Sequence, residues 1–101
     1  MEHIIGDGVY GKGCIWRFYS VEDAEMHDRE SDSWRRAVDE MRLCLGKVWV
    51  DKNDPERKEW VIAGLEDNEP FCDYYWILED EDHTVRYELV NSAGFYENIK
   101  K

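Results

Sequence analysis

The chain has 101 residues, and 24 Asp and Glu against 13 Lys and Arg give it a formal net charge of -11. This length fits a single domain, 1–101, and 43% hydrophobic with 14% aromatic residues exclude a disordered acidic tail, which cannot bury enough apolar surface to fold. No segment reaches the roughly 20 apolar residues of a membrane span, and the first residues lack signal-peptide features. We therefore expect a soluble, cytoplasmic protein without membrane contact.

The cysteines also indicate a cytoplasmic protein. Cys14, Cys44 and Cys72 are odd in number, widely spaced and surrounded by apolar residues. Such a pattern disfavours a disulfide framework. We expect reduced thiols that are buried or half-buried in the core.

The N-terminal part combines a glycine-rich turn with a strand. Residues 6–11 formally satisfy the G-x-G-x-x-G pattern, but a dinucleotide site needs a preceding strand and a following helix. Here the next segment, 14–19, has the aromatic and β-branched residues of a strand. We therefore interpret the glycines as a flexible turn, across which Ile4 and Ile5 are placed to pair with that strand.

Two helices are predicted next, with a break near 31–33. Ser20, followed three residues later by Asp23, has the arrangement of a helix N-cap and predicts a short helix over 20–29. Apolar residues at i, i+3, i+4 and i+7 then predict an amphipathic helix over 33–45. Gly46 follows at the position of a left-handed C-terminal cap.

The second half of the chain has the pattern of an antiparallel meander. Runs of aromatic and β-branched residues alternate with polar turns. The predicted strands are 47–50, 59–65, 73–79 and 84–90, the predicted turns are 51–58, 66–70 and 80–83, and 95–99 closes the chain as a further strand or a helical turn.

This order predicts an α+β domain: an antiparallel sheet of four to five strands with one main amphipathic helix, plus a short helix, packed on one face. Large side chains alternate along the central strands, with Trp76 on one face and Tyr75 and Ile77 on the other. Both faces therefore carry apolar groups. The second face is covered by another part of the chain, or it is a binding surface or a homodimer contact.

No residue pattern predicts catalysis, a metal or a cofactor. His3, His27 and His83 lack the spacing of a metal site, and 80–83 lacks the alternating carboxylates, glycine and distal Glu of a calcium loop. No cysteine has a histidine near it in sequence to activate it as a nucleophile. Carboxylates are so abundant that none is singled out as an acid–base pair.

One segment concentrates the charge. From Glu59 to Val85 the chain has nine carboxylates and no Lys or Arg, which accounts for -9 of the formal -11. Large apolar residues alternate with these carboxylates, so we expect a folded scaffold that displays them in a fixed array, as a nucleic acid displays its phosphates. The predicted partner contacts are Glu66, Asp67, Glu69, Asp73, Glu79, Asp80, Glu81 and Asp82, with Tyr74 and Trp76 as anchors.

These features predict a stoichiometric inhibitor that occupies the basic, nucleic-acid-binding surface of a partner protein and does not itself contact nucleic acid. In overall character the chain resembles the small acidic inhibitors of phages and mobile elements, such as DNA-mimic and anti-CRISPR proteins. The likeness is one of composition and assigns no residue a role. The alternatives are an immunity protein or antitoxin that neutralises a cognate toxin, an oligomeric phage component, and a charged exterior that only maintains solubility.

Overall fold

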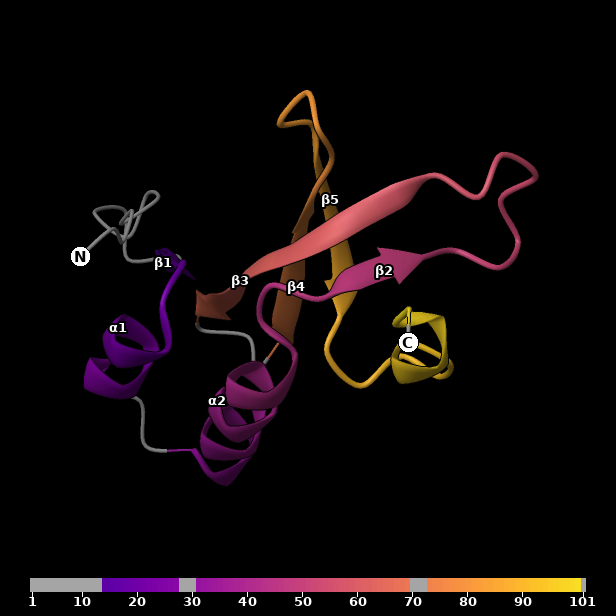
Figure 1. Ribbon diagram of the computed structural model, residues 1–101. Coiled ribbons are helices and arrows are strands. Elements are labelled where there is room, and N and C mark those ends of the chain that lie inside the picture. Colours follow the sequence, from indigo (N-terminus) through magenta and orange to yellow (C-terminus); the bar gives the residue numbers. More distant parts are fainter. Residues whose placement is uncertain (1–13, 28–30, 70–72, 101) are drawn as a thin grey trace.

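The computed structural model describes residues 14–27, 31–69 and 73–100 (Figure 1). It is an α+β fold with a five-stranded antiparallel sheet, as the sequence predicts. The elements are β1 (Cys14–Phe18), α1 (Val21–Met26), α2 (Asp32–Cys44), β2 (Val48–Val50), β3 (Glu59–Glu69), β4 (Asp73–Glu79), β5 (Val85–Leu89) and the 3-10 turn η2 (Tyr96–Asn98). The predicted glycine-rich turn, the pairing of Ile4 and Ile5, and Cys72 lie outside the described residues.

The predicted acidic turn at 66–70 is wrong for the residues up to Glu69, which extend β3. The cause is tertiary. β1 pairs with this second half of β3, placing Arg17 opposite Glu66, while β4 pairs along the other edge. With a neighbour on both sides, the backbone groups of this acidic stretch are bonded within the sheet. β2 pairs with the first half of β3 on the same edge as β1.

A bulge in β3 lies between Ile62 and Gly64. At Gly64 the chain passes so close to β1 that a Cβ would lie 2.4 Å from the carbonyl oxygen of Phe18. Only glycine fits this approach without movement of the backbone. The extra residue keeps Ile62 and Leu65 on the same, buried face of the sheet.

Helix α1 begins at the predicted cap Ser20, and α2 begins one residue before its predicted start, at a cap, Ser31, that was not predicted. The Ser20 hydroxyl accepts a hydrogen bond from the backbone N–H of Asp23 at 3.2 Å, and that of Ser31 accepts one from Trp34 at 3.3 Å. The prediction of two separate helices is therefore confirmed, but α1 ends at Met26 and not at 29, and Asp32 and Ser33 belong to α2. Gly46, after α2, adopts φ +88°, the left-handed conformation that glycine permits at low cost.

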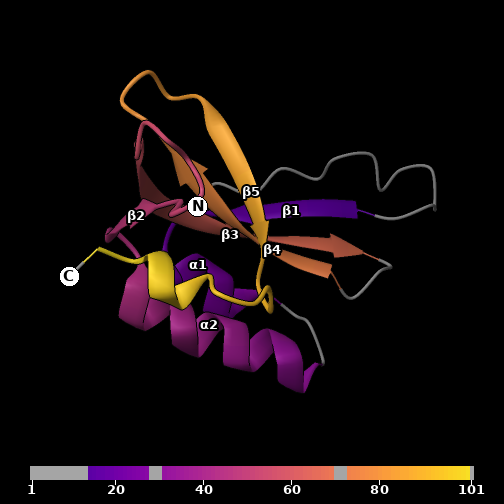
Figure 2. The same cartoon turned by 90° about the vertical axis from the view of Figure 1, so that its right-hand side faces the viewer.

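The core lies between the helices and one face of the sheet, with both helices and η2 on that side (Figure 2). The C-terminal segment contributes Phe95, whose ring stacks on those of Trp49 and Trp76 at centroid distances of 5.6 and 5.4 Å. Ile99 then forms a β-bridge with Trp49. The segment 95–99, which was predicted as a strand or a helical turn, thus contains a 3-10 turn followed by a single β-bridge.

Candidate functional site

The ten predicted contact residues separate into a buried and an exposed set. The buried residues are Glu66, Asp67, Tyr74, Trp76 and Asp80; Glu79 is half-buried, Asp73, Glu81 and Asp82 are exposed, and the side chain of Glu69 lies outside the described residues. Asp73 begins β4 and Glu79 ends it, so the two lie about 20 Å apart at 3.3 Å per residue. The carboxylates therefore do not form one continuous exposed array.

Trp76 and Tyr74 cannot anchor a partner, because both side chains point into the core. Trp76 is 0% exposed and is covered by Phe95 of the C-terminal segment. The Tyr74 hydroxyl lies 2.9 Å from that of Ser31 at the start of α2, and its ring contacts Trp34. The predicted role as anchors is wrong because α2 and η2 cover the face on which these two aromatics lie.

Two acidic residues of β3 make internal contacts instead of facing a partner. Asp67 is 0% exposed, and its Oδ2 lies 2.8 Å from Nε2 of His27. Its neighbour Glu66 is on the opposite face and accepts a hydrogen bond from Nε of Arg17 at 2.9 Å. A buried carboxylate needs such a partner, because an unpaired charge in the interior is costly. We therefore remove both residues from the contact set.

Asp80 holds the β4–β5 turn together. Its carboxylate accepts hydrogen bonds from the backbone N–H groups of Asp82 and Thr84, both at 2.8 Å, and lies 2.7 Å from Nζ of Lys58. Lys58, followed by these two N–H groups, lowers the pKa of Asp80 against the opposing effect of burial. His83, with φ 64°, completes a short loop that ends in a left-handed residue, a common hairpin form.

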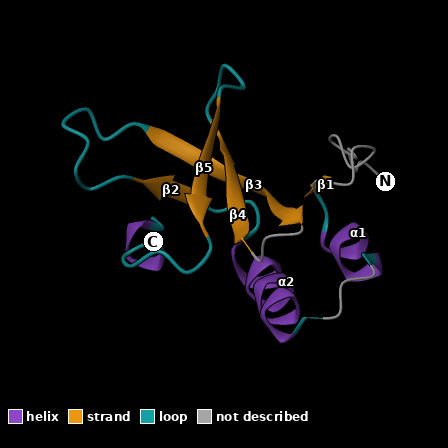
Figure 3. Cartoon of the chain, turned by 180° about the vertical axis from the view of Figure 1, so that it is seen from behind, coloured by secondary structure: helices purple, strands orange, loops and turns teal. Residues whose placement is uncertain are grey.

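The turn therefore presents its remaining carboxylates on a fixed backbone. Lys58, the last residue of the β2–β3 loop, contacts the turn through Asp80, and both the turn and the loop project from the sheet away from α1 and α2 (Figure 3). Between them is a groove of about 430 Å³, which we call the acidic groove; it is lined by Val48, Lys58, Glu59, Val61, Glu79, Asp80 and Glu81. The Glu59 carboxylate forms an ion pair with Lys100, with Oε2 2.6 Å from Nζ. The carboxylates of the groove and turn that remain for a partner are therefore those of Glu79, Glu81 and Asp82.

An exposed apolar row adjoins the acidic groove. On the sheet face opposite the helices, Val61, Val85, Tyr87 and Leu89 are each 41–43% exposed; we call these four the open-face row. Glu79 lies between Val61 and Val85 as their cross-strand neighbour. These four residues were not among the predicted contacts, although the second sheet face was considered as a binding surface and the alternation of Val85, Tyr87 and Leu89 with charged residues indicated the row.

The acidic groove, the turn and the open-face row together form one continuous surface feature. The described part of the chain has no group of three His, Cys, Asp or Glu that could hold a metal ion, and none of its helices is long and apolar enough to cross a bilayer. Comparison with known protein families, with curated proteins and with solved structures finds no match.

Proposed function

We propose that the protein is an inhibitor that binds the basic surface of a partner protein, such as a nucleic-acid-binding protein or a nuclease. The observation that carries this proposal is the position of Glu79, between two residues of the open-face row and at the start of the turn that displays Glu81 and Asp82. An apolar centre with a polar rim is the usual anatomy of a protein interface. Here that rim is acidic, which favours a cationic partner.

Rigidity supports the same proposal. The turn residues are bound internally through Asp80, so holding Glu81 and Asp82 in position costs little further conformational entropy when a partner binds. The half-buried Glu79 belongs to β4 and has His83 Nδ1 3.3 Å from its carboxylate. Carboxylates fixed in this way attract a basic surface at long range and then fit one arrangement of Arg or Lys.

The internal ion pairs support a second candidate function, that of an immunity protein or antitoxin that binds one cognate toxin. Glu59, Glu66 and Asp80 are each paired with a cation of the chain itself, which interrupts the series of charges that a nucleic-acid mimic needs. An apolar row beside a few carboxylates suits one shape-complementary partner. Competition with DNA or RNA separates the two: a mimic is displaced by nucleic acid, whereas a cognate inhibitor need not be.

The test compares two triple variants that each remove three negative charges. The first, Glu79→Gln with Glu81→Gln and Asp82→Asn, keeps Asp80 and therefore the turn. The control, Glu22→Gln with Asp32→Asn and Asp39→Asn, neutralises exposed carboxylates on α1 and α2. Tagged protein expressed in its native host is used to capture partners, and the affinity for the captured protein is measured at low and moderate salt.

We expect the first variant to lose a basic partner that the wild type and the control retain, with a shallower dependence of affinity on salt. Equal losses in both variants would mean that total charge matters and the turn does not. Capture of a partner without a basic surface, at unchanged affinity in the first variant, would overturn the proposal.

A further inference from the structure

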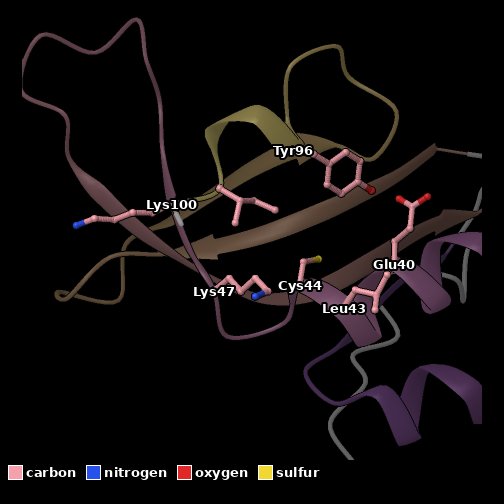
Figure 4. Close-up of a pocket in the computed structure, with 7 residues that line it drawn as sticks. Glu40, Leu43, Cys44, Lys47, Tyr96 and Lys100 are labelled. Atoms are coloured by element: carbon pink, nitrogen blue, oxygen red, sulfur yellow. The ribbon is translucent and has the colours of Figure 1, made fainter.

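A second concave site lies between the C-terminal end of α2 and the C-terminal segment, apart from the acidic groove (Figure 4). It has a volume of about 440 Å³, within the roughly 300–1,000 Å³ of small-molecule sites. The residues that line it are Glu40, Leu43, Cys44, Lys47, Tyr96, Ile99 and Lys100. It approaches the acidic groove at Lys100, through the ion pair with Glu59, and at Lys47, which precedes Val48.

The walls of this pocket are firmly held. The backbone N–H of Lys100 donates to the carbonyl oxygen of Val48 at 2.7 Å, and the indole N–H of Trp49 donates to that of Phe95 at 2.9 Å. These bonds fix η2 and Ile99 against β2, while the buried face of α2 fixes the opposite wall. The pocket is thus preformed, so a ligand does not have to order it.

The lining is mainly apolar. Leu43 is 74% exposed and Tyr96 43% exposed, so two large side chains at the pocket leave much of their surface in water. Cys44 adds a neutral wall, because burial, assisted by Glu40, raises the pKa of its thiol to about 11. A ligand with an apolar body gains free energy by covering these groups.

The charges of the pocket are separated. Lys100 points away (Figure 4) and is already paired with Glu59. Lys47 extends toward Leu43 and Cys44 and makes no ion pair with a carboxylate in the described residues. Glu40 extends toward the Tyr96 hydroxyl at the other end. The ammonium group of Lys47 thus lies beside an apolar surface.

We propose that this pocket binds a small monoanionic amphiphile, with an aromatic or branched aliphatic body against Leu43, Tyr96 and Ile99 and its carboxylate beside Nζ of Lys47. Charge complementarity selects an anion for the end of the pocket at Lys47, because the charge of Glu40, at the far end, is partly offset by the neighbouring Arg36. The inference is independent of the proposed inhibitor function, because neither the turn nor the open-face row takes part.

Three probes with one body test the charge preference: 2-naphthoate, 2-naphthylmethanol and 2-naphthylmethylammonium. Each is titrated into the full chain at moderate salt, and binding is located from the backbone amide NMR signals of Leu43, Cys44 and Ile99. The variants are Lys47→Gln, which removes the cation, and Leu43→Ser, which removes apolar surface. Met26→Ser is the matched control, because Met26 is 75% exposed on α1 and does not line the pocket.

We expect saturable binding of 2-naphthoate that is about threefold to fivefold tighter than that of the alcohol, the size of an exposed ion pair, with the ammonium probe weakest. Lys47→Gln removes this difference, Leu43→Ser weakens all three probes, and Met26→Ser changes none. The proposal is overturned if the ammonium probe binds tightest, if Lys47→Gln has no more effect than Met26→Ser, if the shifted amides lie elsewhere, or if no probe saturates.

Discussion

Nε2 of His27, at the end of α1, lies 2.8 Å from Oδ2 of Asp67 in β3, and both side chains are inside the core. The imidazole ring is surrounded by Trp16, Phe18 and Trp34, with centroid distances of 4.8–5.2 Å. A buried carboxylate is stable only while it keeps its polar partner. The contact therefore ties the short helix to the sheet and makes each residue depend on the other.

Replacing Asp67 with Ala should lower the free energy of unfolding by about 3 kcal/mol, because His27 then loses its carboxylate in a buried site. Urea denaturation followed by tryptophan fluorescence measures the change. Asp73→Ala is the control, since Asp73 is exposed and should change stability by no more than about 0.5 kcal/mol. Similar losses in the two variants would show that the contact does not hold α1.

The ion pair of Asp80 predicts a dependence of stability on pH. Lys58 and two backbone N–H groups hold the pKa of Asp80 below its ordinary 3.8. Because the folded-state pKa is depressed, the stability from this carboxylate is present above the unfolded pKa and is lost as the pH falls through the folded pKa. Wild-type protein should therefore lose stability as the pH falls below 3.8.

Asp80→Asn tests this dependence by measurement of unfolding free energy over a series of pH values. The variant should be less stable at neutral pH and should show a shallower slope in the acid window. Asp82→Asn removes the same charge from an exposed neighbour and should keep the wild-type slope. An unchanged slope in Asp80→Asn would assign the acid sensitivity to other carboxylates, such as Asp51, whose pKa is also lowered, chiefly by the Asn53 N–H.

The adjacent aromatics Phe95 and Tyr96 should differ widely in their importance for stability. Phe95 is 2% exposed and stacks on two tryptophans, whereas Tyr96 is 43% exposed. Phe95→Ala should cost about 3–5 kcal/mol through loss of apolar contact and the cavity left behind. Tyr96→Ala should cost less than about 1 kcal/mol. Thermal and urea unfolding measure both, and equal costs would contradict the docking of the C-terminal segment.

The thiol of Cys44 should react slowly while the protein is folded. Cys44 is 3% exposed, and its raised pKa of about 11 keeps it protonated at pH 8, while the thiolate is the reactive form. Mass spectrometry of the Cys44 peptide after iodoacetamide treatment should show modification only in urea. Rapid labelling of this peptide in buffer would contradict the burial.

The open-face row should matter for binding and little for folding. Tyr87→Thr with Leu89→Thr keeps strand-forming residues in β5 and removes apolar surface that is 43% exposed at each position. We expect a change in stability below about 1 kcal/mol and a loss of affinity for the captured partner at every salt concentration. If affinity is unchanged while the turn variant loses it, the interface is confined to the acidic turn.

Local chemistry was enough to predict most of the elements. Ser20 and Ser31 cap their helices through bonds to residues three positions away, and the 3.6-residue apolar period predicts α2 to within one residue at each end. Strand β4 coincides with the predicted 73–79. These signals depend on near neighbours in the chain, so sequence alone determines them.

Only the tertiary structure decided which carboxylates of the segment from Glu59 to Val85 are buried and which are exposed. Alternation separates the two faces of a strand, but it does not say which face the helices cover, and this choice buries Trp76 and leaves the open-face row exposed. The partners of Glu66 and Asp67 are 49 and 40 residues away in the chain. Sequence therefore determined how much negative charge the protein carries, whereas folding determined which carboxylates gain an internal partner, because that depends on which distant side chains the fold brings alongside.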